Sequence, residues 1–238
     1  MYAAAKGKMR TSKSGRIHAQ LSGISVATRR VEGVTVVGSD VIELEVFYDY
    51  LCPFVYRVSL MLQNAGPSRN LKVIWRYFSL TQVNSKDEGW TVWDAPSAER
   101  VKGRLAFKAA EAARRQDQFE AFHLPLLQAR HRDRLDIDSV EVVERVAVDS
   151  GLDLERFRKD VAAPDILASL ARDHRQAKSQ GIFGTPTIVL PDGASAYLRL
   201  AEAPEAPDAP RVFDHLFAVA AGEPTILEIK RPSKPAPD

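Results

Sequence analysis

The hydrophobic pattern between residues 42 and 78 predicts two strands and a helix between them. Apolar and polar side chains alternate over residues 42–48, which is typical of a strand with one face turned inward. From residue 54 the apolar positions recur at steps of three and four, as on one face of a helix, and we expect this helix to end at residues 64–66, ahead of Pro67. Residues 71–78 again alternate and predict a strand buried on both faces. In such a βαβ unit the two strands should be parallel.

The next part of the chain reads as a loop to residue 96 and then as helical almost throughout. Asp138, with Glu141 three residues later, has the form of a capping box, and Gly151 is suited to close that helix. Pro125 indicates a kink or break in another helix. The predicted helices cover residues 98–116, 119–130 and 138–151, a short segment from Asp153, and a longer one from Pro164 to Gly181. So many helices exceed what a simple crossover needs, so we expect an inserted helical subdomain.

A strand pattern returns after these helices. Pro186 directly precedes the apolar run of residues 187–190, and because proline has no N–H to donate, it should start this strand or lie at a sheet edge. Pro-Asp-Gly at residues 191–193 predicts a turn, with residues 196–200 as the partner strand of a hairpin. The remainder reads as a loop over 201–210, a closing helix over 211–221, and a tail over 223–238.

Residues 1–40 differ from the rest of the chain in charge and pattern. Residues 1–31 contain seven Lys or Arg and no acid, which leaves 26 basic and 31 acidic residues from Glu32 onward. We interpret residues 1–40 as a disordered extension or as the result of a start codon placed too far upstream, in preference to an organellar transit peptide. Residues 34–37 are a candidate edge strand. The mild acidity of the remainder argues against a nucleic-acid groove, and no apolar run approaches the ~20 residues that span a bilayer.

Cys52 is the only cysteine among the 238 residues, and it lies where the strand pattern changes to the helix pattern. Pro53 suits the first helical position, which places Cys52 at the N-cap, where unpaired N–H groups and the helix dipole favour a thiolate. The alternative is an inert buried cysteine, since free cysteine is among the most buried residue types. One cysteine excludes an internal disulfide, which suits a cytoplasmic protein. The hydrophobic content of 45% is enough for one sizeable core.

These residues also carry a family resemblance. Cys52-Pro53-Phe54-Val55, after the strand end Phe-Tyr-Asp, resembles the active-site segment of the DsbA-type and FrnE-like thioredoxin-fold oxidoreductases, whose motif is Cys-Pro-aromatic-Cys. Valine here replaces the second cysteine, which in a dithiol enzyme resolves the mixed disulfide. The runs Gly-Thr-Pro-Thr at residues 184–187 and Trp-Arg-Tyr-Phe at residues 75–78 are also similar to that family.

The resemblance implies an α/β, thioredoxin-like fold with a large inserted helical subdomain. It covers residues 41–222, of which 41–80 and 184–222 would form the thioredoxin core and 97–181 the helical insertion. It further implies a cis proline beside the active-site cysteine, with an exposed backbone that pairs with an incoming thiol peptide. The implied thiol-binding residues are Pro53, Phe54, Thr185 and Pro186.

Other candidate sites are weaker. Trp90 and Trp93 are candidates for a lid, although large aromatic residues in a polar loop more often pack on neighbouring helices. His123 and His174 read as ordinary helix residues. Five histidines without short ligand spacing and a single cysteine predict no metal site, and the absence of a glycine-rich phosphate loop predicts no bound nucleotide cofactor.

The function favoured by the sequence is that of a monothiol thiol-disulfide oxidoreductase or thiol transferase of the cytoplasm. Cys52 would be the nucleophile, with a low-molecular-weight thiol, glutathione or mycothiol, as co-substrate. The expected partner is a small thiol or a disulfide-containing substrate, and neither nucleic acid nor a membrane is expected. The sequence leaves open whether the chain forms a homodimer. One alternative is a relative of the hydroxychromene-carboxylate isomerases and kappa-class glutathione transferases, which usually place serine at this position. The other is a redox-inactive thioredoxin-fold binding module.

Overall fold

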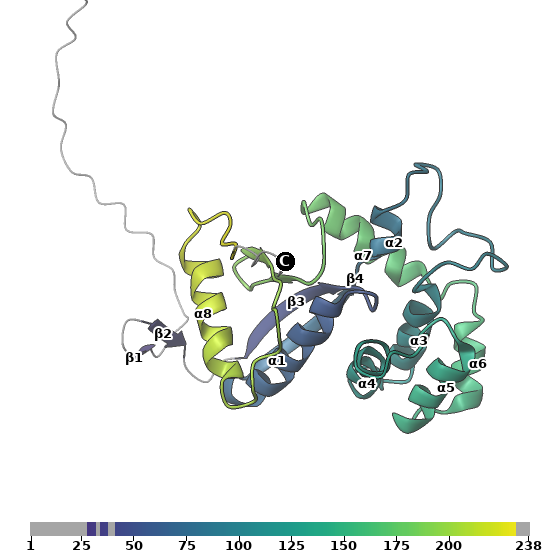
Figure 1. Ribbon diagram of the computed structural model, residues 1–238, viewed down its shortest axis with the longest axis horizontal. Helices are drawn as coiled ribbons and strands as arrows, with labels where there is room; N and C mark the ends of the chain where they lie inside the picture. The colour runs from purple at the N-terminus through teal and green to yellow at the C-terminus, as the bar shows by residue number, and fades with distance from the viewer. Residues whose placement is uncertain (1–27, 32–33, 38–40, 232–238) are drawn as a thin grey trace, which may run out of the picture. The chain divides into compact units, whose positions relative to one another are not determined.

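The computed structural model describes residues 28–31, 34–37 and 41–231 (Figure 1). The chain divides into two compact units, Met1–Gly38 and Ser39–Asp238. In the first unit, strands β1 (Thr28–Val31) and β2 (Val34–Val37) pair antiparallel as a separate two-stranded sheet. The predicted strand at residues 34–37 is confirmed, and its partner is the segment just before it. The prediction of disorder over residues 1–40 lies largely outside the described residues.

The second unit is built on a four-stranded sheet of order β4-β3-β5-β6. The central strand β3 is parallel to β4 and antiparallel to β5, which pairs antiparallel with β6. The parallel βαβ unit is as predicted. Burial of β4 on both faces is not observed, because one face carries Lys72, which reaches solvent and forms an exposed ion pair with Glu43 of β3. The strands are β3 (Ile42–Tyr48), β4 (Leu71–Tyr77), β5 (Thr187–Val189) and β6 (Ser195–Tyr197).

Helix α1 (Pro53–Arg69) connects β3 to β4 and is longer than its sequence pattern indicates. Pro67 lies inside the helix, so the prediction of an end at residues 64–66 is wrong. A proline in the last turn removes one backbone hydrogen bond, which a helix of this length tolerates. Asn70 then ends the helix in the left-handed conformation and donates its backbone N–H to the Gly66 carbonyl.

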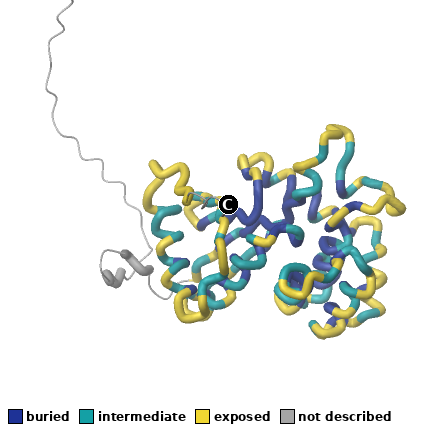
Figure 2. The backbone as a smooth tube through the Cα atoms, viewed as in Figure 1, coloured by how far each residue is buried: buried dark blue, intermediate teal, exposed yellow. Residues whose placement is uncertain are grey.

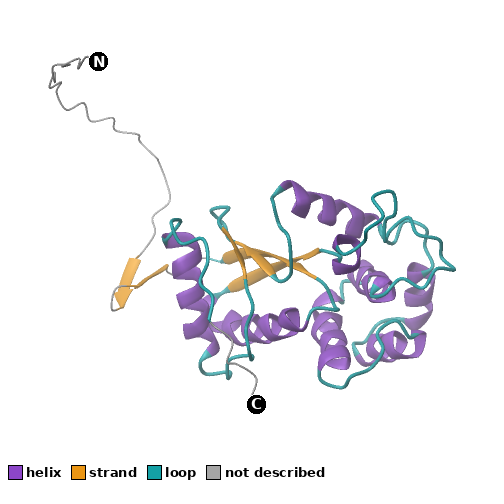
Figure 3. Cartoon of the chain, turned by 45° about the horizontal axis from the view of Figure 1, so that its top comes forward, coloured by secondary structure: helices purple, strands orange, loops and turns teal. Residues whose placement is uncertain are grey.

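Both faces of the sheet are covered (Figures 1 and 3). Alternate residues of β3 explain this, since Leu44, Val46 and Tyr48 join the main core with α1, while Phe47 points to the opposite side. There Phe47 packs in a small cluster with Phe78 and with residues at the end of α7 (Ala168–Ser179). Helix α8 (Ala209–Gly222) packs beside α1.

The insertion between β4 and β5 is helical, as predicted, with shifted boundaries. The segment predicted as 98–116 is helical only from Arg104, and the segment predicted from Pro164 only from Ala168. Helix α4 runs through Pro125 without a break, and the short α2 falls in the stretch predicted as a loop. The dark blue buried segments in Figure 2 continue from the sheet into these helices, in one core. The helices before α7 are α2 (Leu80–Val83), α3 (Arg104–Arg115), α4 (Phe119–His131), α5 (Val140–Asp149) and α6 (Leu154–Val161).

Two helix starts predicted in the insertion had different outcomes. Helix α6 starts at Asp153 as expected, where the Asp153 carboxylate caps the helix by accepting the Arg156 N–H at 2.9 Å. Asp138 does not form the predicted capping box, since the N-cap of α5 is Ser139. The Asp138 carboxylate instead accepts the N–H of Gly103, the N-cap of α3, at 2.7 Å. Asp138 thus caps the start of α3, which lies 35 positions earlier in the sequence.

The C-terminal residues 223–231 are described without helix or strand, and three apolar side chains there are exposed, namely Ile226, Leu227 and Ile229. Over the described parts of the chain, no helix has both the length and the apolar character needed to cross a bilayer.

Candidate active site

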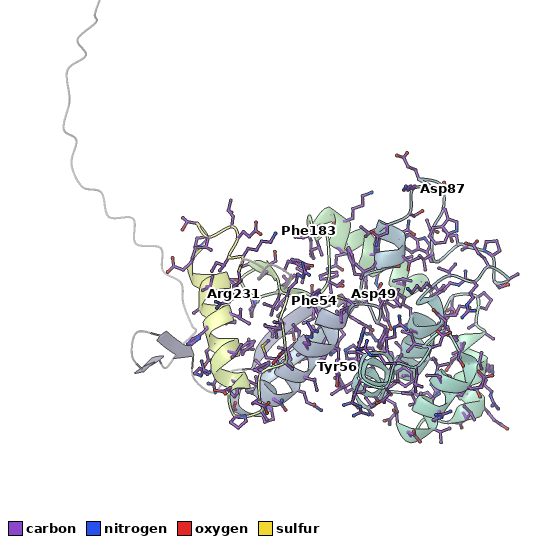
Figure 4. The ribbon with its side chains drawn as sticks, in the orientation of Figure 1. Asp49, Phe54, Tyr56, Asp87, Phe183 and Arg231 are labelled. Carbon is purple, nitrogen blue, oxygen red and sulfur yellow. The ribbon has the colours of Figure 1, made fainter. Side chains whose placement is uncertain are left out.

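The loop from Asp49 to Cys52 joins the end of β3 to the start of α1, and Asp49 holds it in place. One carboxylate oxygen accepts the Leu51 N–H at 2.8 Å, and the other accepts the Leu80 N–H at 2.7 Å. The Asp49 carbonyl accepts the Cys52 N–H at 3.0 Å. Asp49 is fully buried, so it fixes the cysteine loop against the first residue of α2 from inside the protein. Figure 4 labels Asp49 close to the start of α1.

The charge of Asp49 is sensitive to its surroundings. Burial raises the pKa of this carboxyl group to about 6, and the two N–H donors that it accepts offset part of that effect. Asp49 was not predicted as a site residue. Its place directly after the strand, three residues before Cys52, was the available signal.

Cys52 is the N-cap of α1, as predicted, and Pro53 occupies the first helical position. The thiol makes no hydrogen bond to the N–H groups at the start of the helix. Instead Sγ donates a hydrogen bond to the Thr185 carbonyl at 3.2 Å, which only the protonated thiol can do. No acidic residue lies in the first turn of α1, so the positive end of its dipole is unopposed within that turn.

Thr185 and Pro186 lie beside Cys52, and the peptide bond between them is cis, as the resemblance implied. Both residues are buried, whereas the prediction was an exposed backbone. The Thr185 carbonyl accepts the thiol, and the Pro186 carbonyl accepts the Leu198 N–H at 3.0 Å. These two carbonyls already have partners within the fold. The buried Thr185 hydroxyl has none among the described residues.

Phe54 lies two residues beyond Cys52, and its half-buried ring contacts two arginines. The Arg199 guanidinium carbon lies 4.3 Å from the ring centroid and that of Arg57 lies 5.4 Å from it. Arg57 Nη1 also donates to the Leu200 carbonyl at 2.8 Å. The neighbouring Pro53 is exposed. Neither arginine was predicted, because Arg199 and Leu200 come from the far end of the hairpin.

Trp90 and Trp93 pack within their own loop and on α7. The Trp93 ring lies 5.5 Å from the His174 ring, and the Arg175 guanidinium carbon lies 6.0 Å from the Trp93 ring centroid. Trp90 Nε1 donates to Glu99 at 3.1 Å. The ring contacts of these tryptophans within the described residues do not include Cys52 or Phe54. Of the two interpretations, packing on a neighbouring helix accounts for Trp93.

A buried polar network lies behind the cysteine loop. His123 Nδ1 is 3.1 Å from the Tyr50 hydroxyl, and Nε2 is 3.4 Å from the Ser59 hydroxyl. Burial lowers the pKa of His123 to about 3, so the imidazole is neutral at physiological pH. His131 Nε2 lies 2.9 Å from the Tyr50 carbonyl. Both histidines therefore position the segment before Cys52. This role was not predicted for His123, which the sequence indicated to be an ordinary helix residue.

On one side of the loop, a polar cavity of about 320 Å³ borders Leu51. Its charged walls include Lys102, Arg130 and the ion pair of Arg100 with Asp136. Among the described residues, no group of three or more His, Cys, Asp or Glu side chains is placed to hold a metal ion.

Comparisons with known proteins agree with this fold. The family of DSBA-like thioredoxin domains matches residues 43–211. The chain is 25% identical over 195 residues to the uncharacterized protein Rv2286c of Mycobacterium tuberculosis, which covers 79% of this chain and 81% of that protein. The family match over residues 43–211 includes Cys52, Thr185 and Pro186.

Solved structures show the same architecture. A thioredoxin-like oxidoreductase from Silicibacter pomeroyi is 26% identical, with a TM-score of 0.50, over 73% of this chain and 87% of that one. The cytosolic disulfide reductase DsbM from Pseudomonas aeruginosa, solved with GSH, is 20% identical, with a TM-score of 0.53, over 74% of this chain and 98% of that one. At 20% identity, the similarity to DsbM shows only that the two chains share a fold.

Proposed function

Because the chain belongs to the family of DSBA-like thioredoxin domains, we propose that it is a monothiol thiol-disulfide oxidoreductase in which Cys52 is the nucleophile. The observation that carries the proposal is the place of the only cysteine, at the N-cap of α1 and in contact with the residue before the cis proline. A thiolate at a helix N-terminus is stabilised by the dipole, and the thiolate is the form that attacks disulfides.

The reaction that we propose has two exchange steps. The Cys52 thiolate attacks one sulfur of a disulfide RS–SR, which forms the mixed disulfide of Cys52 with RS and releases RS⁻, which takes up a proton. Val55 occupies the helix position from which a second cysteine would resolve that adduct, and it is buried in the core. A thiol from solution, R′SH, therefore attacks as R′S⁻, forms RS–SR′ and returns the Cys52 thiolate.

The structure also bears on the size of the substrate. Only 5% of the Cys52 surface is exposed, so a disulfide has to reach the sulfur through a small opening. The neighbouring Thr185 carbonyl, which a peptide strand would need for pairing, accepts the thiol hydrogen in the reduced protein. Both features favour a small disulfide, with a small thiol such as glutathione or mycothiol as co-substrate, over an extended polypeptide.

Substitution of Cys52 tests the proposal. Wild-type protein treated with a small disulfide should gain one mixed-disulfide adduct, detected by intact mass, and a reducing co-thiol should remove it and allow turnover. Cys52→Ser should form no adduct, and its turnover should fall to the uncatalysed rate. Folding of the variant is checked by circular dichroism.

The outcomes separate the alternatives. Wild-type protein that forms an adduct only after unfolding would contradict an active thiol and favour a redox-inactive binding module. Glutathione-dependent isomerisation of a hydroxychromene carboxylate that survives in Cys52→Ser would favour the isomerase and glutathione transferase relatives. Loss of adduct and turnover in the variant alone supports the oxidoreductase.

A further inference from the structure

Phe54 and two arginines form a cluster next to the reactive cysteine. Phe54 follows Cys52 by two residues on α1, and the guanidinium groups of Arg199 and Arg57 lie 4.3 Å and 5.4 Å from its ring centroid. Guanidinium groups lie over aromatic rings through cation–π attraction, which holds these long side chains at the ring. Figure 4 labels Phe54 in this region of the molecule.

Backbone contacts connect this cluster to the cis proline. The Leu198 N–H donates to the Pro186 carbonyl at 3.0 Å, and Arg199 is the next residue. Arg57 Nη1 then donates to the Leu200 carbonyl at 2.8 Å, so the segment that carries Arg199 is attached to α1. The cluster is thus connected through backbone hydrogen bonds to Pro186, the residue after the Thr185 carbonyl that accepts the thiol hydrogen of Cys52.

Arg57 and Arg199 form no ion pair with an acidic residue in the described part of the chain, in contrast to arginines such as Arg69 and Arg76. Arg199 is exposed and Arg57 is half-buried. A guanidinium held against a ring keeps N–H groups at its edges, and those groups match a carboxylate in geometry and charge.

We propose that Arg57 and Arg199, held by Phe54, bind a carboxylate of the small thiol or disulfide that reacts at Cys52. The substrate class is then a carboxylate-bearing thiol, glutathione and its disulfide, and not mycothiol, which has no carboxylate. This inference rests on the proposed function, because it needs Cys52 to exchange with a small disulfide. It adds the residues that select which disulfide.

The experiment compares two disulfides, one anionic and one neutral. Rate constants for adduct formation at Cys52 are measured by stopped mixing and intact mass with glutathione disulfide and with bis(2-hydroxyethyl) disulfide. The ratio of the two constants, anionic over neutral, reports recognition of charge and cancels effects on the thiol itself. In Arg199→Gln this ratio should fall about two- to fivefold, the usual worth of one solvent-exposed charged pair.

Three further variants sharpen the test. Arg199→Lys should keep part of the preference, because the charge remains and the fork geometry is lost. Arg130→Gln removes an arginine that lines the polar cavity beside Leu51, and Arg211→Gln removes one that pairs with Asp208 on α8. Both should leave the ratio as in the wild type. Added salt should lower the wild-type ratio toward that of Arg199→Gln, since exposed charges are screened.

An unchanged ratio in Arg199→Gln, or a fall only in Arg130→Gln, would overturn the inference. The failure of the proposed function looks different, because Cys52 would then react with neither disulfide in any of these proteins. Reaction with the neutral disulfide but no preference for the anionic one would leave the oxidoreductase in place and remove the arginine site.

Discussion

The pKa of Asp49 is raised to about 6 by burial, which makes this residue a source of pH-dependent stability beside the cysteine loop. A carboxyl group whose pKa is higher in the folded than in the unfolded state binds its proton more tightly when folded. Its contribution is therefore favourable below its ordinary value of 3.8 and is lost as the pH rises to about 6. A shift of this size corresponds to about 3 kcal/mol.

His123 has the opposite effect on the pH dependence of stability. Burial lowers its pKa to about 3, so the unfolded chain takes up a proton there at a pH at which the folded protein does not. Stability from this histidine is lost as the pH falls below the ordinary value of 6.5, and His174, with its pKa lowered to about 4, acts in the same direction. In the wild type, Asp49 offsets part of the loss of stability in acid.

Asp49→Asn should therefore make the protein more sensitive to acid than the wild type. The neutral amide removes the offset, so the free energy of unfolding should fall more steeply between about pH 7 and about pH 4. A constant loss is also expected at every pH, because one amide oxygen replaces two carboxylate oxygens that accept the Leu51 and Leu80 N–H groups. Urea denaturation across this range measures both. A variant curve parallel to that of the wild type would contradict the shifted pKa.

Among the helices and strands, the cap of α3 is supplied from a distant part of the sequence. The Asp138 carboxylate accepts the Gly103 N–H at 2.7 Å, and Gly103 has no side chain with which to cap. Gly103 has a left-handed φ of 79°, and an added Cβ would lie 3.0 Å from the Leu51 side chain. Asp138 thus serves a helix start that approaches the cysteine loop closely.

Asp138→Ala should lower the free energy of unfolding by about 1–2 kcal/mol, the usual cost of losing a helix cap. Ser139→Ala is the matched control, since Ser139 is the N-cap of α5 but its hydroxyl caps no backbone N–H of that helix and donates instead to the exposed Glu141 carboxylate. Its loss should stay below about 0.5 kcal/mol. Equal losses in the two variants, measured by denaturant titration, would contradict a cap supplied across helices.

These caps also show which parts of the structure the sequence could predict. The strands of the βαβ unit and the place of Cys52 followed from local periodicity and from Pro53, because both depend on neighbouring residues. The start of α3 and the role of Asp138 were missed, because that contact joins residues 35 positions apart. The arginine cluster was missed for the same reason, since Arg57 meets Leu200 across 143 positions.

For the second unit as a whole, the sheet and the helical insertion share one core. Tyr48 of the central strand lies 4.8 Å from the His123 ring and 6.4 Å from the Phe107 ring, and Trp75 of β4 lies 4.1 Å from His123. The Tyr48, Trp75 and Phe107 rings belong to a continuous hydrophobic cluster that includes Leu44, Phe157 and Phe213. A shared core of this kind couples the two parts energetically, because neither can open without exposing apolar surface of the other.

Residues 41–231 should consequently unfold in one cooperative transition, although the insertion is helical and the rest is built on a sheet. Far-ultraviolet circular dichroism, which follows mainly the helices, and tryptophan fluorescence should give the same midpoint in urea. Phe107→Ala, in α3, should move both midpoints together, with a loss of about 3–5 kcal/mol, the usual range for a buried aromatic side chain. A shift confined to the circular dichroism signal would mean that the insertion unfolds by itself.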